Sequence, residues 1–310
     1  ILFLSTLKVP AWLPGAVWGA GVGIHPTLVF FAPLVFQSVG RSSRFLQAVC
    51  AFLLVASVLY GPFLLSRRTI PSPWADLSTI SGWWDYVSAR LYRKYFFSLP
   101  LAFWPRRFLA WLAIMARQFT PLGALLVALG FLRLWRSSRS MAAATLSTFA
   151  AISLWAMGYN TADSSVYLTL ALPLAAFWLG IGFGEIALRL GKTRSLLSWM
   201  LMAIPLLQLL LFGRSISLRG DRSAVEWARG VMEAAPSGAI LVSSSDAHTF
   251  TLWYVQEVLG ERPDILVVDR DLWWHGPYRK MILKALGIGE SVMGIEELSA
   301  LTRRPIVEAR

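Results

Sequence analysis

Cysteine, histidine and charged residues are all scarce in this chain of 310 residues. A single cysteine excludes a disulfide framework and a cysteine-based zinc site, and three histidines form no obvious metal cluster. Only 15% of the residues are charged and 56% are hydrophobic, compared with roughly 45–50% in soluble domains. This composition excludes a disordered chain and argues against an entirely soluble globule.

Positive charge is concentrated in the more hydrophobic part of the chain. Residues 1–213 contain 17 lysines and arginines but only four acids, whereas residues 214–310 contain 12 bases and 13 acids. Bases that punctuate hydrophobic runs are typical of an integral membrane protein rather than of a nucleic-acid-binding one. We therefore expect contact with membrane lipid and no nucleic-acid partner.

Several apolar runs approach the roughly 20 residues that a membrane-spanning helix needs. The sequence predicts such helices at 45–65, 120–135, 141–158, 166–188 and 196–212. Two shorter apolar segments, 12–23 and 26–39, meet at a break around His25. A break at membrane depth is tolerated where it faces protein or a wet cavity, so His25 has two interpretations, as hydrogen-bonded packing or as a functional residue.

Lysine and arginine in the short loops predict the orientation of the chain. Loops 40–44, 133–140 and 189–195 are basic and are expected in the cytoplasm, which places 66–118, 159–165 and the tail from 214 outside. We expect a protein of the bacterial inner (plasma) membrane with an extracytoplasmic C-terminal domain. Because the chain begins at Ile1 within an apolar run and ends on RRPIVEAR, we also expect a fragment of a longer protein.

The segment 66–107 is strongly basic although it is expected outside, which departs from the rule that basic loops lie in the cytoplasm. Its apolar spacing from 80 to 97 predicts an amphipathic helix in the membrane interface. Trp84, Val87, Leu91 and Tyr95 would share one face, and Arg90, Arg93 and Lys94 the opposite face. This helix either only lies on the membrane or holds a lipid-linked phosphate with its basic side chains, and the sequence leaves both open.

Two carboxylates in external segments have a structural and a functional interpretation. Asp76, before the predicted helix, is either a helix cap or ion-pair partner, or a catalytic or sugar-binding group. Asp163 either caps the helix that carries Tyr167 or belongs to a loop that lines an outer pocket.

The tail alternates between apolar strand runs and helical patterns, which predicts a small parallel sheet. Helices are expected at 224–235, 249–259, 278–286 and 295–301, and strands at 239–243, 265–269 and 305–307. The loop after the first strand contains Asp246, His248 and Thr249, and loops at the carboxyl ends of such strands bind ligands. Asp246 and His248 have the alternative role of capping the helix that follows.

The predicted fold class is therefore mainly α, with a polytopic transmembrane helical domain at 1–213 and a small soluble α/β domain at 214–310. No residue pattern supports a cofactor. A divalent metal is chemically conceivable but has no support in the sequence.

Five stretches carry a resemblance to a known family: GVGIHPTLVFFAP, SPWADLST, GWWDYVSARLYRKYF, GYNTADSSVYL and PSGAILVSSSDAHTFTLWYVQEVLGERPDILVVD. From about Trp12 to Ile306, the chain resembles a domain-of-unknown-function family of multi-spanning membrane proteins. That family includes transmembrane O-mannosyltransferases with a GT-C-like fold. Ile24, Ala75 and His248 depart from residues that the family usually has, which are asparagine, glycine and a second aspartate.

The resemblance implies an incomplete GT-C-like fold and transfer of a sugar, with mannose as the suggestion, at the outer membrane face. The donor would be a polyprenyl-phosphate sugar and the acceptor a protein or glycan. The catalytic acidic loop would lie upstream of Ile1, so no catalytic residue is assigned. Arg90, Arg93 and Lys94 would bind the donor phosphate, and the pocket would be lined by His25, Trp74, Asp76, Trp84, Tyr92, Asp163 and Tyr167.

Two other classes of function remain open. A transporter would suit the broken helices, but it predicts ionisable residues within several spans, and the polar features cluster at one face instead. A membrane-anchored binding or scaffold protein would recruit partners through the tail. It predicts that the basic external loop can be neutralised without loss of function.

Overall fold

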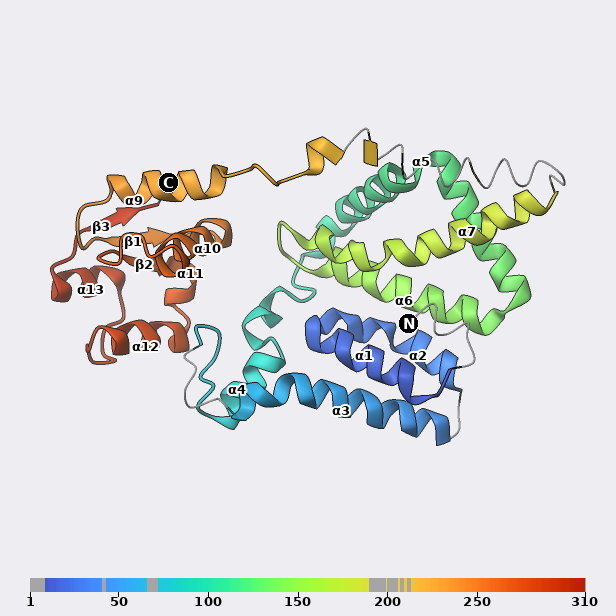
Figure 1. The fold of residues 1–310 in the computed structure, drawn as a ribbon, viewed down its shortest axis with the longest axis horizontal. Coiled ribbons are helices and arrows are strands. Elements are labelled where there is room, and N and C mark those ends of the chain that lie inside the picture. The colour runs from blue at the N-terminus through green and yellow to red at the C-terminus, as the bar shows by residue number, and fades with distance from the viewer. Residues whose placement is uncertain are drawn as a thin grey trace. The chain divides into compact units, whose positions relative to one another are not determined.

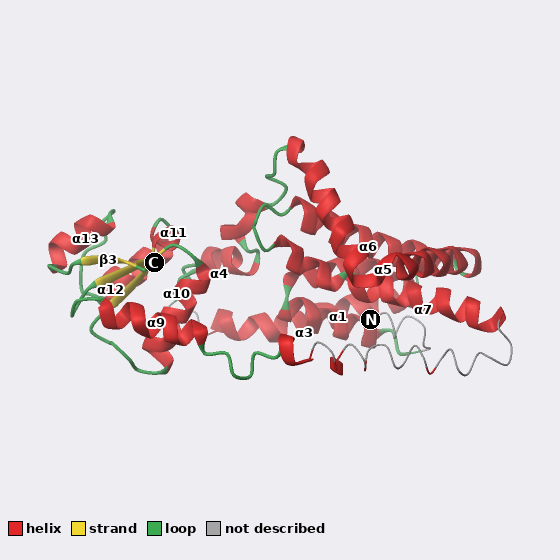
Figure 2. Cartoon of the chain, turned by 90° about the horizontal axis from the view of Figure 1, so that it is seen from above, coloured by secondary structure: helices red, strands yellow, loops and turns green. Residues whose placement is uncertain are grey.

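The computed structural model describes residues 9–40, 43–65, 72–189 and 213–309, together with the single positions 199, 206, 209 and 210. The described chain is mainly helical with a small sheet near the C-terminus, as the sequence predicts (Figures 1 and 2). Contacts divide it into two units. We call Ile1–Leu65 with Ala89–Leu207 the helical unit, and Ser66–Ser88 with Gln208–Arg310 the α/β unit.

The helical unit consists of α-helices joined by short 3-10 helices, which are labelled η. In chain order these are α1 (Trp12–Ile24), η2 (Pro26–Phe31), α2 (Ala32–Val39), α3 (Ser43–Leu65), η3 (Arg90–Tyr95), η4 (Leu101–Phe103), α5 (Trp104–Ser137), α6 (Arg139–Gly158), η5 (Ser164–Leu170) and α7 (Leu172–Arg189). The predicted break at His25 is confirmed. His25 has the extended dihedral angles φ −149° and ψ 121°, and Pro26 begins the next helix.

Four of the described helices are long and apolar enough to cross a membrane: Ser43–Gly61, Leu101–Ser137, Arg139–Gly158 and Leu172–Arg189. The predicted span at 166–188 begins later than expected, because η5 occupies its first residues. The predicted span at 196–212 lies almost entirely outside the described residues. Exposed leucines on α3, including Leu53 and Leu54, give the candidate span Ser43–Gly61 the apolar surface that contact with the hydrocarbon core of a bilayer requires.

A kink divides the longest helix, α5. Thr120 adopts the left-handed φ of 59° with ψ 165°, and Pro121 follows it. Proline has no N–H and its ring clashes with the preceding turn, which is a common cause of helix kinks. The sequence predicted only the half after this kink as a span, whereas the helix extends back to Trp104.

Small residues allow the membrane helices to pack closely. Gly15 and Gly19 of α1 face the backbone of α3 at Ala48 and Phe52, and Gly130 of α5 faces the carbonyl of Trp178 in α7. A methyl group at any of these three glycines would overlap the neighbouring backbone. Close backbone approach through small residues is a principal source of helix association in membranes.

The α/β unit contains a three-stranded parallel sheet in the order β2-β1-β3. Its elements are α4 (Ile80–Val87), α9 (Ser223–Ala234), β1 (Ile240–Ser243), α10 (Asp246–Trp253), a π-helical turn η7 (Tyr254–Val258), β2 (Leu266–Asp269), α11 (Arg270–Trp273), α12 (Gly276–Ala285), α13 (Ile295–Thr302) and β3 (Ile306–Glu308). The small parallel sheet that the sequence predicts for residues 214–310 is therefore confirmed.

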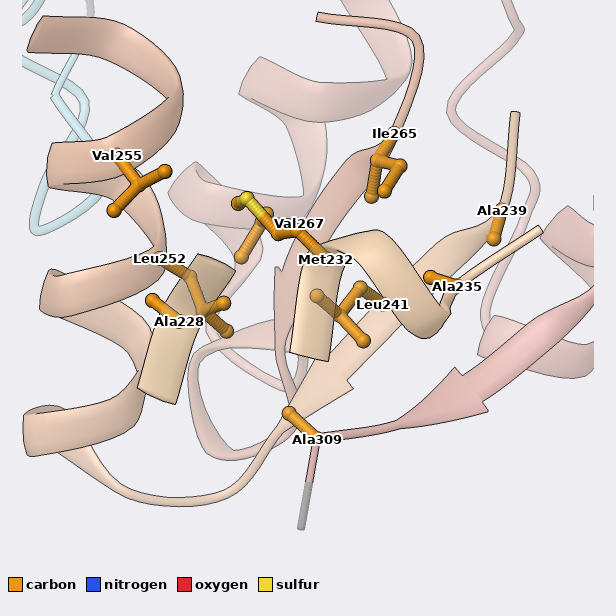
Figure 3. Packing of buried hydrophobic residues seen from close by; sticks show 10 residues of the cluster. All are labelled: Ala228, Met232, Ala235, Ala239, Leu241, Leu252, Val255, Ile265, Val267 and Ala309. Carbon is orange, nitrogen blue, oxygen red and sulfur yellow. The ribbon is translucent and has the colours of Figure 1, made fainter. Parts of the chain in front are cut away.

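Helices cover both faces of this sheet. Leu241 of β1 and Val267 of β2 pack against α9, α10 and η7, as Figure 3 shows. Val242 and Val268 point to the other face and pack against Trp273 and the helices α12 and α13. Burial on both faces explains why β1 and β2 are continuous apolar runs rather than alternating ones.

The predicted amphipathic helix from 80 to 97 is wrong as a single element. Helix α4 ends at Val87, Ala89 adopts the left-handed angles φ 51° and ψ 41°, and the separate helix η3 begins at Arg90. A left-handed residue after the last turn redirects the chain and ends a helix. Arg90, Arg93 and Lys94 therefore lie on η3 and not on the helix that carries Trp84.

Candidate functional site

Aromatic rings from four separate segments meet at the C-terminal end of α6. We call this group the aromatic cluster: His25, Tyr95, Phe96, Trp155, Tyr159 and Tyr167. The Tyr167 ring centroid lies 5.2 Å from that of Tyr159 and 6.0 Å from that of His25. The cluster spans more than a hundred positions of the sequence, from His25 to Tyr167, and the break at His25 and the short helix η5 bring its ends together.

Backbone contacts fix the loop that enters this cluster. The Asn160 N–H donates to the carbonyl oxygen of Tyr95 at 2.9 Å. The guanidinium of Arg107, at the start of α5, donates to the Ser164 hydroxyl and to the Thr161 carbonyl. Loop 159–164 is therefore tied to η3 on one side and to α5 on the other.

The two tyrosines of η5 and α6 are held in their neutral form. Burial raises the pKa of Tyr159 and of Tyr167, and the negative charge of Asp163 raises both further. The hydrogen bond between the two phenol groups raises the pKa of Tyr159 and partly offsets the rise for Tyr167, and Tyr92 also raises the pKa of Tyr159. A raised phenol pKa keeps the proton in place, so these hydroxyls are hydrogen-bond donors at neutral pH.

Two hydrogen-bonding atoms next to the cluster are buried without a partner in the described part of the chain. They are the Trp155 Nε1–H group and the Thr161 hydroxyl. Buried polar groups in folded proteins are nearly always paired. A hydroxyl group or a phosphate oxygen of a bound molecule would give either atom a partner.

Basic side chains lie beside the aromatic cluster. Arg90, Arg93 and Lys94 are exposed on η3. The Lys94 ammonium group lies 5.1 Å from the centre of the Tyr95 ring, and that ring lies 6.1 Å from Tyr159. Cation and aromatic faces attract at such distances, so Lys94 is positioned next to the cluster.

The sequence-predicted pocket residues divide between the two units. His25, Tyr92, Asp163 and Tyr167 belong to the helical unit: Tyr167 contacts both His25 and Tyr159, and Tyr92 and Asp163 lie near Tyr159. Trp74, Asp76 and Trp84 belong to the α/β unit. Sequence reasoning missed Tyr159, Trp155 and Arg107 as site residues. Tyr159 stood within the quoted stretch GYNTADSSVYL, but Trp155 lies in an apolar helix where no pattern distinguishes it.

Trp74 and Asp76 are fixed against the helices of the α/β unit. The Trp74 carbonyl accepts a hydrogen bond from His275 Nε2 at 2.8 Å, and its ring lies 6.2 Å from that of Phe250. Asp76 Oδ1 accepts hydrogen bonds from the Ser78 N–H and hydroxyl groups. These bonds, with a smaller effect from Lys280, lower the pKa of Asp76 and keep its carboxylate charged.

The tail residues Asp246, His248 and Thr249 lie in the first two turns of α10, after the cap residue Ser245. His248 stacks on Trp227 of α9, with ring centroids 4.2 Å apart. Thr249 is 1% exposed, and its hydroxyl donates to Asp269 Oδ2 at 2.6 Å. In the segment predicted to bind a ligand, the Thr249 side chain is therefore part of a buried polar network with Asp269.

Metal ligands do not cluster in the described residues. Within 9–40, 43–65, 72–189 and 213–309, no group of three histidine, cysteine or acidic side chains could hold a metal ion.

Comparison with known families gives one match. Residues 224–278, from α9 to the start of α12, match the family described as TMEM260-associated domain 2. No curated protein and no solved structure matches the chain. The matched stretch includes β1, β2, His248, Thr249 and Asp269, so the similarity covers the core of the α/β unit.

Proposed function

We propose that this chain is part of a membrane glycosyltransferase that takes a sugar, with mannose as the first candidate, from a polyprenyl-phosphate donor. The acceptor would be a protein or a glycan at the outer membrane face. The observation that carries the proposal is the convergence of His25, Tyr92, Asp163 and Tyr167 around Tyr159, beside the basic helix η3. The four helices able to span a membrane support a lipid-linked donor.

Each part of this site has a chemical role in the proposed reaction. The exposed ring of Tyr92, which is 38% exposed beside the buried aromatic cluster, offers an apolar surface for a sugar ring. Cleavage of the bond between sugar and phosphate leaves negative charge on the lipid phosphate. Arg90, Arg93 and Lys94 would stabilise that charge as it develops.

The test uses purified protein in liposomes with a radiolabelled polyprenyl-phosphate mannose. Replacing Arg90 and Arg93 with glutamine should lower donor turnover without changing the thermal unfolding midpoint. The matched control replaces Arg136, exposed at the end of α5, and Arg139, exposed at the start of α6, and should leave turnover unchanged. Equal turnover in both double variants would refute the phosphate role.

A second outcome would favour a binding protein. If the wild-type protein retains donor without turnover, the site binds a lipid-linked sugar but does not transfer it.

A further inference from the structure

Helix α4 presents an exposed apolar face. Ile80 is 70% exposed and Trp84 is 58% exposed. These two residues are four apart, so they lie on one face of the helix. The helix begins with a regular cap, in which the Thr79 hydroxyl accepts from the Gly82 N–H at 2.9 Å. The start of the helix is therefore well defined.

The chain on both sides of α4 leads to candidate membrane spans. Helix α3, which contains the span Ser43–Gly61, ends at Leu65, and the next candidate span begins at Leu101. Two consecutive spans keep the intervening chain on one side of the bilayer and close to its surface. Tryptophan is enriched at the headgroup level, where its ring is amphipathic. The basic residues of η3, which follow directly, suit anionic headgroups.

A continuous series of contacts connects α4 to the sheet. Gly82 packs so closely on the Asp76 carbonyl that a methyl group there would overlap it. Ala75 and Leu77, on either side of Asp76, are buried. The Trp74 carbonyl bonds to His275, next to α12, and the Trp74 ring contacts Phe250 of α10.

From these observations we infer that α4 is a membrane-interface anchor for the α/β unit, with Ile80 and Trp84 inserted at the headgroup level of the lipid bilayer. Segment 72–79 transmits this anchoring to α10 and α12. The α/β unit would then be held at a fixed depth and orientation on the membrane surface, rather than tethered by a flexible linker. This inference does not depend on the proposed glycosyl transfer.

Site-specific labelling tests the anchor, because the chain has one cysteine to remove. In a Cys50→Ser background, Trp84→Cys carries an environment-sensitive fluorophore, and the full chain is placed in lipid nanodiscs. Leu54→Cys, on the exposed face of α3, is the lipid control, and Glu290→Cys, an exposed residue before α13, is the water control. Quenching is measured with headgroup-level doxyl lipid and with aqueous iodide.

We expect the label at Trp84 to be quenched by the doxyl lipid and protected from iodide, as the Leu54 label is protected. Ile80→Cys should behave in the same way. A label at Trp84 that iodide quenches as strongly as the Glu290 label would overturn the inference. So would a label that neither quencher reaches, because protein rather than lipid would then cover this face. Thermal unfolding of each labelled variant confirms that the comparison is made on folded protein.

Discussion

The buried network at the carboxyl end of the sheet gives a prediction whose magnitude follows from the structure. The Ser243 and Thr249 hydroxyls are hydrogen-bonded to one another, and Thr249 donates to the Asp269 carboxylate. All three side chains are at most 3% exposed. Thr249→Val keeps the shape of the side chain but removes the donor. A hydrogen bond to a charged group contributes about 1.5–3 kcal/mol, and an orphaned buried partner adds about 1–3 kcal/mol.

We therefore expect Thr249→Val to destabilise the α/β unit by about 3 kcal/mol, which is about a 100-fold increase in the opening equilibrium. Hydrogen exchange of the β1 and β2 amides in the full chain measures that equilibrium directly. Thr249→Ser keeps the hydroxyl and should recover most of the protection. Thr251→Val is the matched control, because the Thr251 hydroxyl lies on the same helix but is exposed and bonds only to the Ala247 carbonyl.

Exchange in Thr249→Val as slow as in Thr251→Val would refute a structural role for this threonine. That result would favour the sequence-based prediction that Thr249 binds a ligand.

Two further predictions concern helix packing and pH. Gly130→Ala should lower the thermal unfolding midpoint in detergent, because the added Cβ would overlap the Trp178 carbonyl and overpacking costs about 1–3 kcal/mol. Gly180→Ala, whose added Cβ meets nothing within 4 Å, is the control. The Arg262 guanidinium and the Gly238 N–H lower the pKa of Asp264 below its ordinary 3.8. The stabilising effect of Asp264 is therefore fully present above pH 3.8 and is lost as the pH falls from 3.8 through the lowered pKa of the folded state. The unfolding midpoint of the wild type should therefore decline more steeply than that of Asp264→Asn between roughly pH 5 and pH 2; parallel curves would contradict this.

The strands and most helices could be predicted because their patterns are local. Runs such as Ile240–Ser243 and Leu266–Asp269 are short, apolar and bounded by turn residues, and they form β1 and β2. The break at His25 also has a local cause, the following proline. The incorrect prediction of a single helix from 80 to 97 has a different origin. Apolar spacing continues across Ala89, but one residue with left-handed dihedral angles interrupts the helix, and alanine gives no sequence signal for that conformation.

The candidate site was only partly predictable, because its residues are brought together by tertiary packing. Composition identified His25, Asp163 and Tyr167 as unusual polar groups in an apolar chain. It could not indicate that Tyr159 lies among them, since tyrosine at the end of a membrane helix is ordinary. Arg107 was one of several bases in a basic segment, and only its hydrogen bonds to Ser164 and Thr161 distinguish it.

The division of segment 66–107 changes how the function must be tested. Trp74 is fixed by contacts to His275 and to Phe250 of α10, whereas Tyr95 and Phe96 are fixed by contacts to Asn160 and to Trp155 of α6. A carboxylate at Asp76 and a base at Lys94 are close in sequence, but each is held by a different set of contacts. Loss of activity after a change at Asp76 therefore reports on the α/β unit, and loss after a change at Lys94 reports on the helical unit. Single substitutions at these two positions therefore test donor binding and domain anchoring separately.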